Sequence, residues 1–96
     1  MELEQVLKAN RQKILTTAHK YGAYDVRIFG SVVRGETGPD SDIDFLVNLE
    51  SGRSLLDLAR LLRELQALLG VKVDIVTEAG LRPRLRSQVL KEARLL

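Results

Sequence analysis

Cysteine is absent from this chain of 96 residues, proline occurs only twice, and only four residues are aromatic. Without cysteine, neither a disulfide framework nor a thiolate metal site is possible. Few prolines and a hydrophobic content of 45% exclude a disordered chain and indicate a globular protein. Because leucine rather than aromatic residues dominates the apolar content, the composition favours helices around an aliphatic core.

Long apolar runs and an excess of one charge are also missing. No segment reaches the ~18 consecutive apolar residues of a membrane-spanning helix. The N-terminal stretch MELEQVLKANRQK lacks the apolar core of a signal peptide. The net charge is +2 with both signs scattered, which argues against a nucleic-acid-binding surface. These absences predict an intracellular, cytoplasmic protein.

The length predicts a single domain, residues 1–96, with a small core. A core of this size leaves little room for a substrate pocket beside a folding nucleus. We therefore expect a partner protein or a second copy of the chain to complete the substrate pocket, in a hetero- or homo-oligomer.

Hydrophobic periodicity and breaker residues predict an order of α, β, turn, β, α, β, α. The expected elements are a helix over 3–21, a strand over 24–30, a turn over 31–41 with one helical turn at its start, a strand over 42–49, a helix over 55–69, a strand over 71–77 and a helix over 79–95. Ser54 and Asp57 resemble a capping box, and Gly70 suits a helix C-terminus. The leucines after Ser54 favour a core-facing helix over a coiled coil, because sustained heptads are missing.

The stretch FGSVVRGETGPDSDIDF contains acids at every second position, and two of them fall on a predicted strand. Successive side chains of a strand alternate faces, so Asp42 and Asp44 share one face while apolar residues share the other. In VKVDIVT the same alternation sets Asp74 opposite the apolar face. If these two strands are neighbours, three carboxylates lie together on one side of the sheet.

Such a cluster needs a positive partner. Two carboxylates ~4 Å apart repel by about 1 kcal/mol in water and by about 4 kcal/mol at an effective dielectric of 20. A divalent cation reverses that sign, and Mg²⁺ takes one or two carboxylates plus phosphate oxygens. Two such ions can clamp the attacking and leaving oxygens of a phosphoryl or nucleotidyl displacement. The cluster therefore favours metal-assisted chemistry on a phosphate ester.

A candidate phosphate site precedes the acids. A strand that stops at Gly30 and turns into a short helix at Ser31 exposes backbone N–H groups to an anion, and glycine allows a close approach. The Ser31 hydroxyl can add a donor. Arg34, one helical turn further on, is placed to reach a phosphate oxygen.

A calcium-binding loop is the rival interpretation, because Asp40, Asp42 and Asp44 match its positions 1, 3 and 5. It fails at position 6, which is Phe45 rather than glycine, and at position 12, which is Ser51 rather than glutamate. We therefore reject it. Asp40 follows a proline in the predicted turn and is not expected to be a ligand.

Gly30-Ser31, ten intervening residues and Asp42-Ile43-Asp44 reproduce the GSx10DxD signature of the nucleotidyltransferase superfamily related to DNA polymerase beta. Within it, the chain resembles the minimal nucleotidyltransferases, or MNT domains, nearly end to end. The resemblance runs through FGSVVRGETGPDSDIDFLV, LGVKVDIVTEAGLRPRL and the closing helix. It implies an α+β fold of two layers, in which a small mixed sheet packs against helices.

The resemblance also implies roles for the site residues. Asp42 and Asp44 would bind Mg²⁺, with two ions expected in the site. Asp74 would be the third carboxylate, which helps bind metal or activates the attacking hydroxyl. Gly30 and Ser31 would hold the triphosphate of ATP.

Many MNT proteins pair with HEPN proteins as antitoxin and toxin. The resemblance therefore implies that this chain transfers AMP from ATP to a tyrosine hydroxyl of a HEPN toxin, as the antitoxin of a type VII-like pair. Two alternatives stay open: a binding module that neutralises its partner by covering it, and transfer to another acceptor. Leucines on the outer helices and Arg82, Arg84 and Arg86 are the candidate covering surface.

Overall fold

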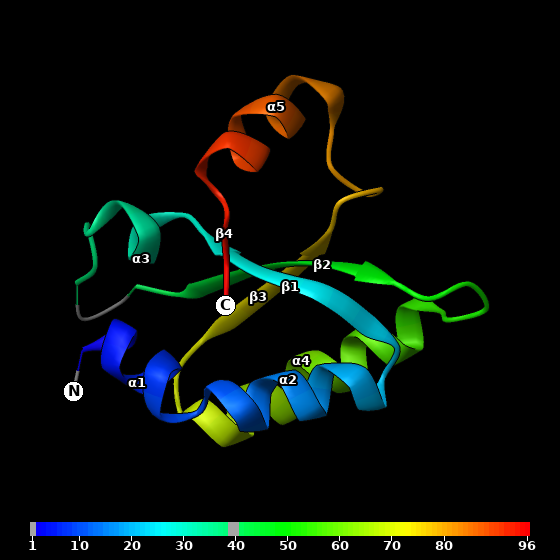
Figure 1. The fold of residues 1–96 in the computed structure, drawn as a ribbon, viewed down its shortest axis with the longest axis horizontal. Coiled ribbons are helices and arrows are strands. Elements are labelled where there is room, and N and C mark those ends of the chain that lie inside the picture. Colours follow the sequence, from blue (N-terminus) through cyan, green and yellow to red (C-terminus); the bar gives the residue numbers. More distant parts are fainter. Residues whose placement is uncertain (1, 39–40) are drawn as a thin grey trace.

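A computed structural model describes residues 2–38 and 41–96, and within them the chain forms five helices and four strands (Figure 1). The elements in chain order are α1 (Leu3–Ala9), α2 (Arg11–Lys20), β1 (Ala23–Phe29), α3 (Ser31–Arg34), β2 (Ile43–Leu49), α4 (Leu55–Leu69), β3 (Val73–Thr77), α5 (Pro83–Glu92) and β4 (Arg94–Leu95). None of the helices in the described part of the chain has the length and apolar character needed to span a membrane.

The four strands form one mixed sheet in the order β3-β2-β1-β4. β1 pairs antiparallel with both β2 and β4, whereas β2 pairs parallel with β3. Parallel neighbours need a crossover connection, and α4 supplies it between β2 and β3. This arrangement confirms the predicted α+β fold with a small mixed sheet packed against helices.

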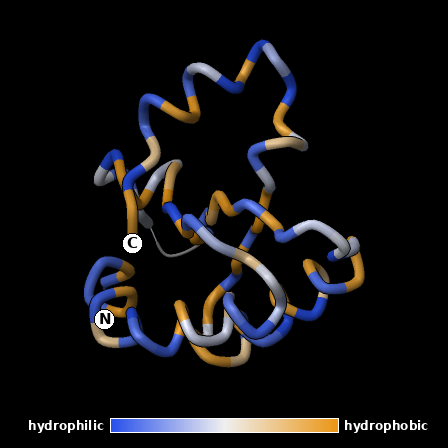
Figure 2. Tube along the Cα trace, turned by 45° about the vertical axis from the view of Figure 1, so that its right-hand side comes forward, coloured by the Kyte–Doolittle hydropathy of each residue, from blue (hydrophilic) through white to orange (hydrophobic). Residues whose placement is uncertain are grey.

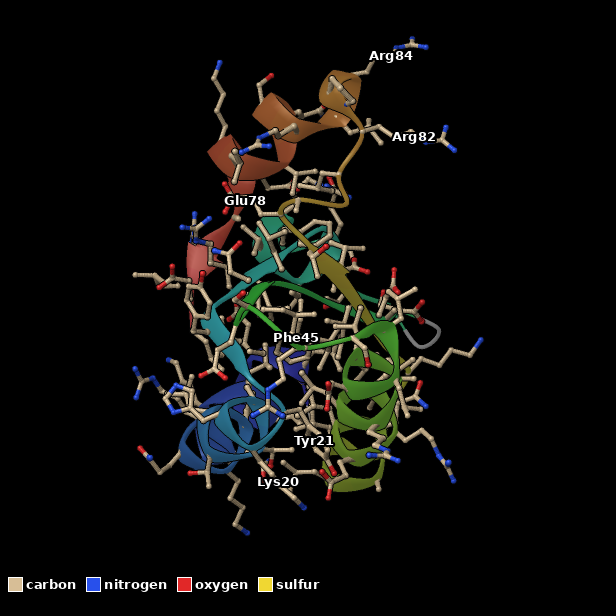
Figure 3. The ribbon with its side chains drawn as sticks, turned by 90° about the vertical axis from the view of Figure 1, so that its right-hand side faces the viewer. Lys20, Tyr21, Phe45, Glu78, Arg82 and Arg84 are labelled. Carbon is tan, nitrogen blue, oxygen red and sulfur yellow. The ribbon has the colours of Figure 1, made fainter. Side chains whose placement is uncertain are left out.

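Helices α1, α2 and α4 cover one face of the sheet, and the core lies between them and the strands (Figure 1). On β2, Ile43, Phe45 and Val47 are at most 2% exposed and point toward these helices, as Figure 3 shows for Phe45. The leucines of α4 that pack on them are Leu61, Leu65 and Leu69. α4 is therefore the core-facing helix that its leucine pattern predicts.

The opposite face of the sheet, which we call the α5 face, carries Asp44 and Leu46 of β2 and Asp74 and Val76 of β3. α5 lies on that side but none of its residues is buried, and the segment from β3 through α5 arches away from the sheet (Figures 1 and 2). Hydrophilic residues are interspersed with hydrophobic ones along this arch (Figure 2). One face of the sheet is thus packed against three helices, whereas the α5 face is covered only in part: Leu46 is 1% exposed and Asp44 is half-buried, but Asp74 is exposed.

The prediction of one helix over 3–21 is wrong, because the chain breaks into α1 and α2 at Asn10. Asn10 has φ −112° and ψ 9°, outside the helical region. Its side-chain Nδ2 donates to the carbonyl oxygen of Val6 at 2.9 Å. Asparagine side chains compete in this way with the helical backbone bonds. The hydrophobic periodicity carries no trace of this break.

The prediction of a closing helix over 79–95 is also wrong at both ends. The helix begins at Pro83, since the residue before a proline is pushed into an extended conformation, and Arg82 has φ −65° and ψ 140°. After Glu92 the chain becomes extended and adds β4 to the edge of β1, where Arg27 pairs with Leu95. The other strands differ from their predicted ranges by one or two residues.

Candidate functional site

Asp44 and Asp74 lie directly opposite each other on neighbouring strands. The parallel register of β2 and β3 pairs Ile43 with Val73 and Asp44 with Asp74. Because the two apolar partners are buried against the helices, the two carboxylates project from the α5 face. Asp42 comes one residue before β2 begins and is half-buried. The structure therefore brings Asp44 and Asp74 together, and the charge of Asp42 acts on Asp44.

The pKa of Asp44 is raised above its ordinary value. Burial is the largest cause, and the negative charges of Asp74, Asp42 and Glu92 add to it, whereas the positive charge of Arg34 acts in the opposite direction. The site is thus a concentration of negative charge that a bound cation would stabilise.

Gly30 ends β1 beside this cluster, and its conformation requires glycine. Its φ of 80° and ψ of −151° fall in a region essentially restricted to glycine. A Cβ at this position would also collide with Oδ2 of Asp44. The sequence predicts close approach of a phosphate to Gly30, and the structure adds that a carboxylate of the site already lies against it.

Helix α3 begins at Ser31 and is the short helical turn expected after Gly30. Ser31 is half-buried, and Arg34 lies at the exposed C-terminal end of the turn. Arg34 is held by two carboxylates: its Nη1 donates to Oε1 of Glu92 at 2.6 Å, and its Nε donates to Oε2 of Glu36 at 2.9 Å. The other oxygen of Glu92, Oε2, accepts from the backbone N–H of Gly30 at 3.2 Å.

A second polar group lies further along the sheet, centred on Glu78. Its carboxylate is 3.6 Å from Nη1 of Arg27 and 3.2 Å from Nη2 of Arg86 on α5. Asn48 also donates to it from Nδ2 at 3.3 Å. Figure 3 shows Glu78 on the side of the sheet toward α5, so this group ties α5 to the strands.

The donor set fits a hard divalent cation. No three acidic or imidazole groups among residues 2–38 and 41–96 lie close enough together to hold one metal ion by themselves. Mg²⁺ needs only one or two carboxylates when phosphate oxygens and water complete its octahedron. Asp42, Asp44 and Asp74 offer carboxylate oxygens of this kind, and their mutual repulsion favours a cation.

Glu92 and Glu78 were missed by the sequence reasoning, because neither belongs to a motif or to a spacing that points at the site. Their places depend on where α5 and the turn before it settle in the fold. Arg82 and Arg84 project away from the molecule (Figure 3), whereas Arg86 is paired with Glu78. Asp40, which is not expected to be a ligand, lies outside the described residues.

The model of the nucleotidyltransferase domain family matches residues 3–96 of the chain. The chain therefore belongs to this family, as the signature of Gly30, Ser31, Asp42 and Asp44 predicts, and its substrate is a nucleotide. It is similar to the protein adenylyltransferase MntA of Thermococcus cleftensis, with 38% identity over 91 residues, which are 95% of this chain and 89% of the relative.

Solved structures agree with the family and the fold. The chain is similar to a candidate minimal nucleotidyltransferase, with 57% identity, a TM-score of 0.89 and coverage of 100% of this chain and 97% of that chain. A toxin–antitoxin complex with AMP-PNP matches at 24% identity and a TM-score of 0.76, covering 90% of this chain and 71% of that one. A tri-AMPylated Shewanella oneidensis HEPN toxin in complex with an MNT antitoxin matches at 21% identity and a TM-score of 0.70, covering 92% and 69%. At such identities the last two bear on the fold alone.

Proposed function

We propose that this chain is a Mg²⁺-dependent nucleotidyltransferase that transfers AMP from ATP to a tyrosine hydroxyl of a HEPN-type toxin and thereby acts as its antitoxin. The observation that carries the proposal is the register of Asp44 opposite Asp74 on the α5 face, with Gly30 beside Asp44 and the charge of Asp42 acting on it. A site that concentrates carboxylates next to backbone N–H donors suits a metal-bound triphosphate.

The position of each residue in the site indicates its role in the proposed reaction. Asp42 and Asp44 would hold Mg²⁺, which supplies charge neutralisation at the triphosphate when bound. Asp74, exposed and opposite Asp44, is placed to hold metal or to accept the proton of the attacking hydroxyl. Gly30 and Ser31 would hold the triphosphate through backbone N–H groups and the Ser31 hydroxyl. Arg34 would add a positive charge at the phosphates.

The acceptor and the partner are inferred from relatives. The relative from Thermococcus cleftensis is named a protein adenylyltransferase. The complex from Shewanella oneidensis contains a HEPN toxin that carries AMP. The exposure of Asp74 supports the same proposal, because a protein acceptor must reach the carboxylates from outside.

The decisive experiment is label transfer from radiolabelled ATP with Mg²⁺ to a HEPN protein encoded beside this chain. We expect labelled toxin with the wild type and at least a hundredfold less with Asp42→Asn combined with Asp44→Asn, because both metal-binding charges are lost. Asp25→Asn is the matched control: it removes an exposed acid at φ 50°, which asparagine tolerates. The proposal would be contradicted if the wild type transferred no label, or if the double variant transferred as much label as the wild type.

A binding module that neutralises its partner by covering it is the second candidate. Two leucines at the start of α4 favour it, since Leu55 is 81% and Leu56 58% exposed. The outward-pointing Arg82 and Arg84 extend the available surface (Figure 3). If the double Asp variant still protects cells from the toxin, binding is sufficient. If protection is lost while the complex persists, the chemistry is required.

A further inference from the structure

The carboxylate of Glu92 bridges two groups that the proposed function assigns to the nucleotide. One oxygen accepts from the backbone N–H of Gly30 at 3.2 Å, and the other accepts from Nη1 of Arg34 at 2.6 Å. The contact is partly shielded, because the side chain of Glu92 is 20% exposed. Glu92 is distant in sequence, at the last residue of α5, so only the fold brings it here.

A carboxylate and a phosphate group make the same demands on these donors. Both are anions with two or more acceptor oxygens, and both form short, charge-assisted hydrogen bonds with guanidinium and backbone N–H groups. While Glu92 accepts the N–H of Gly30 and one N–H of Arg34 Nη1, neither of these two hydrogens is available to a phosphate oxygen. Glu92 also adds a negative charge beside Asp44, where a triphosphate would bring further negative charge.

The attachment of α5 permits Glu92 to leave. None of the ten residues of α5 is buried, so no core packing fixes the helix against the sheet. Its contacts with the rest of the fold include two ion pairs, Arg86 with Glu78 at 3.2 Å and Arg34 with Glu92. The arginine of each pair is about half exposed, at 48% for Arg34 and 50% for Arg86, and ion pairs that water can reach contribute little to stability. β4 begins two residues after Glu92 and pairs with β1, so displacement of the Glu92 side chain needs no unfolding of the core.

We propose that Glu92 is an internal competitor of the nucleotide: its carboxylate occupies the N–H of Gly30 and the guanidinium of Arg34, and the triphosphate must displace it to bind. This inference rests on the proposed function, which places the triphosphate at these donors. It makes Glu92 a residue that sets nucleotide affinity, and it couples nucleotide binding to release of the Glu92 side chain from Gly30 and Arg34. The apparent affinity is reduced by the fraction of molecules in which the contact is open.

Calorimetric titration with ATP and Mg²⁺, and separately with inorganic tripolyphosphate, tests the inference. Glu92→Ala removes the competing carboxylate and keeps a residue that favours helix. If the contact is closed in about nine molecules out of ten, its loss tightens binding of both ligands about tenfold. Glu92→Gln keeps the shape but not the charge, and we expect an intermediate gain.

Glu36→Gln is the matched control. Glu36 also pairs with Arg34, at 2.9 Å, but the Gly30 N–H is held by Glu92. We expect Glu36→Gln to change the affinity for ATP and for tripolyphosphate less than twofold. Equal gains in the Glu36 and Glu92 variants would overturn the inference, because they would reflect general charge removal. Weaker binding by Glu92→Ala would overturn it too, because Glu92 would then position Arg34 for the phosphate.

The outcomes separate this inference from the proposed function. Tighter nucleotide binding by Glu92→Ala, with no AMP transfer by any variant, supports the inference and overturns the proposed function. If Glu92→Ala binds the nucleotide as tightly as the wild type, and the wild type transfers AMP, the inference is overturned and the proposed function is supported. No binding of ATP or tripolyphosphate by any variant overturns both. Thermal unfolding of each variant in the absence of ligand checks that the fold is intact.

Discussion

Two independent constraints at Gly30 disfavour a side chain there. The first is the backbone conformation, at φ 80° and ψ −151°, and the second is the Asp44 carboxylate that lies where a Cβ would be. Strain of the first kind costs about 1–3 kcal/mol. The second affects the site directly, because Asp44 must move if a methyl group is added.

We therefore expect Gly30→Ala to lower the free energy of unfolding by about 1–3 kcal/mol and to reduce AMP transfer beyond what the lost stability explains. Gly35→Ala is the matched control at the other end of α3. Gly35 has φ 72° but open space around it, so alanine there is strained without colliding with anything. Chemical denaturation and the label-transfer assay measure the two effects. If both variants lose stability equally and keep activity, Asp44 is not constrained by Gly30.

Asp44 itself should make the stability of the ligand-free protein depend on pH. Its pKa is raised in the folded chain, first by burial and then by Asp74 and Asp42, so the folded state binds the proton more tightly than the unfolded state. Stability therefore falls as the pH rises from about 3.9, the unfolded value, through the folded pKa. Above that pKa the charged carboxylate weakens the fold.

Asp44→Asn removes this charge, and we expect it to raise the melting temperature by a few degrees at pH 7 to 8. The difference should shrink as the pH falls through the folded pKa and vanish below the unfolded pKa of about 3.9, where the wild-type carboxyl is neutral in both the folded and the unfolded state. Circular dichroism melts in a chelating buffer measure it. A lower melting temperature for the variant at pH 7, or a difference independent of pH, would contradict the account.

Among the elements, α4 has a capping box that fixes its N-terminus. Oγ of Ser54 accepts from the backbone N–H of Leu56 at 3.3 Å, and Oδ2 of Asp57 accepts from the N–H of Ser54 at 3.1 Å. Loss of such a cap costs about 0.5–2 kcal/mol. We expect Ser54→Ala to lower the melting temperature by about 4–8 °C per kcal/mol lost. Ser51→Ala, in the exposed turn before the helix, is the matched control and should melt like the wild type.

The elements that the sequence predicts well are those whose ends are fixed locally. Both ends of α4 follow from Ser54, Asp57 and Gly70, because a cap acts within one helical turn. The break at Asn10 depends on one side chain bonding to its own backbone, which periodicity does not register. β4 exists because the free edge of β1 accepts another strand, a tertiary effect with no local signal.

At the scale of the whole molecule, the convergence of the carboxylates could be predicted because two local rules combine. Alternation fixes the face of each acid, and the apolar partners of Asp44 and Asp74 fix which face is buried. The only assumption needed was that the two strands are neighbours. Glu92 could not be predicted, because its approach to Gly30 depends on the path of α5 and on β4 returning to the sheet.

The parallel ladder between β2 and β3 also bears on the order in which the chain folds. β1 and β2 meet across a short connection, whereas β3 reaches β2 only after α4 has crossed the sheet. Pairings of larger sequence separation form later, and here Asp44 and Asp74 repel each other as the strands meet. We therefore expect this ladder to close after the β1–β2 pair has formed. The capacity to bind metal and nucleotide then needs more than the β1–β2 hairpin, because Asp74 joins Asp44 only when β3 has paired.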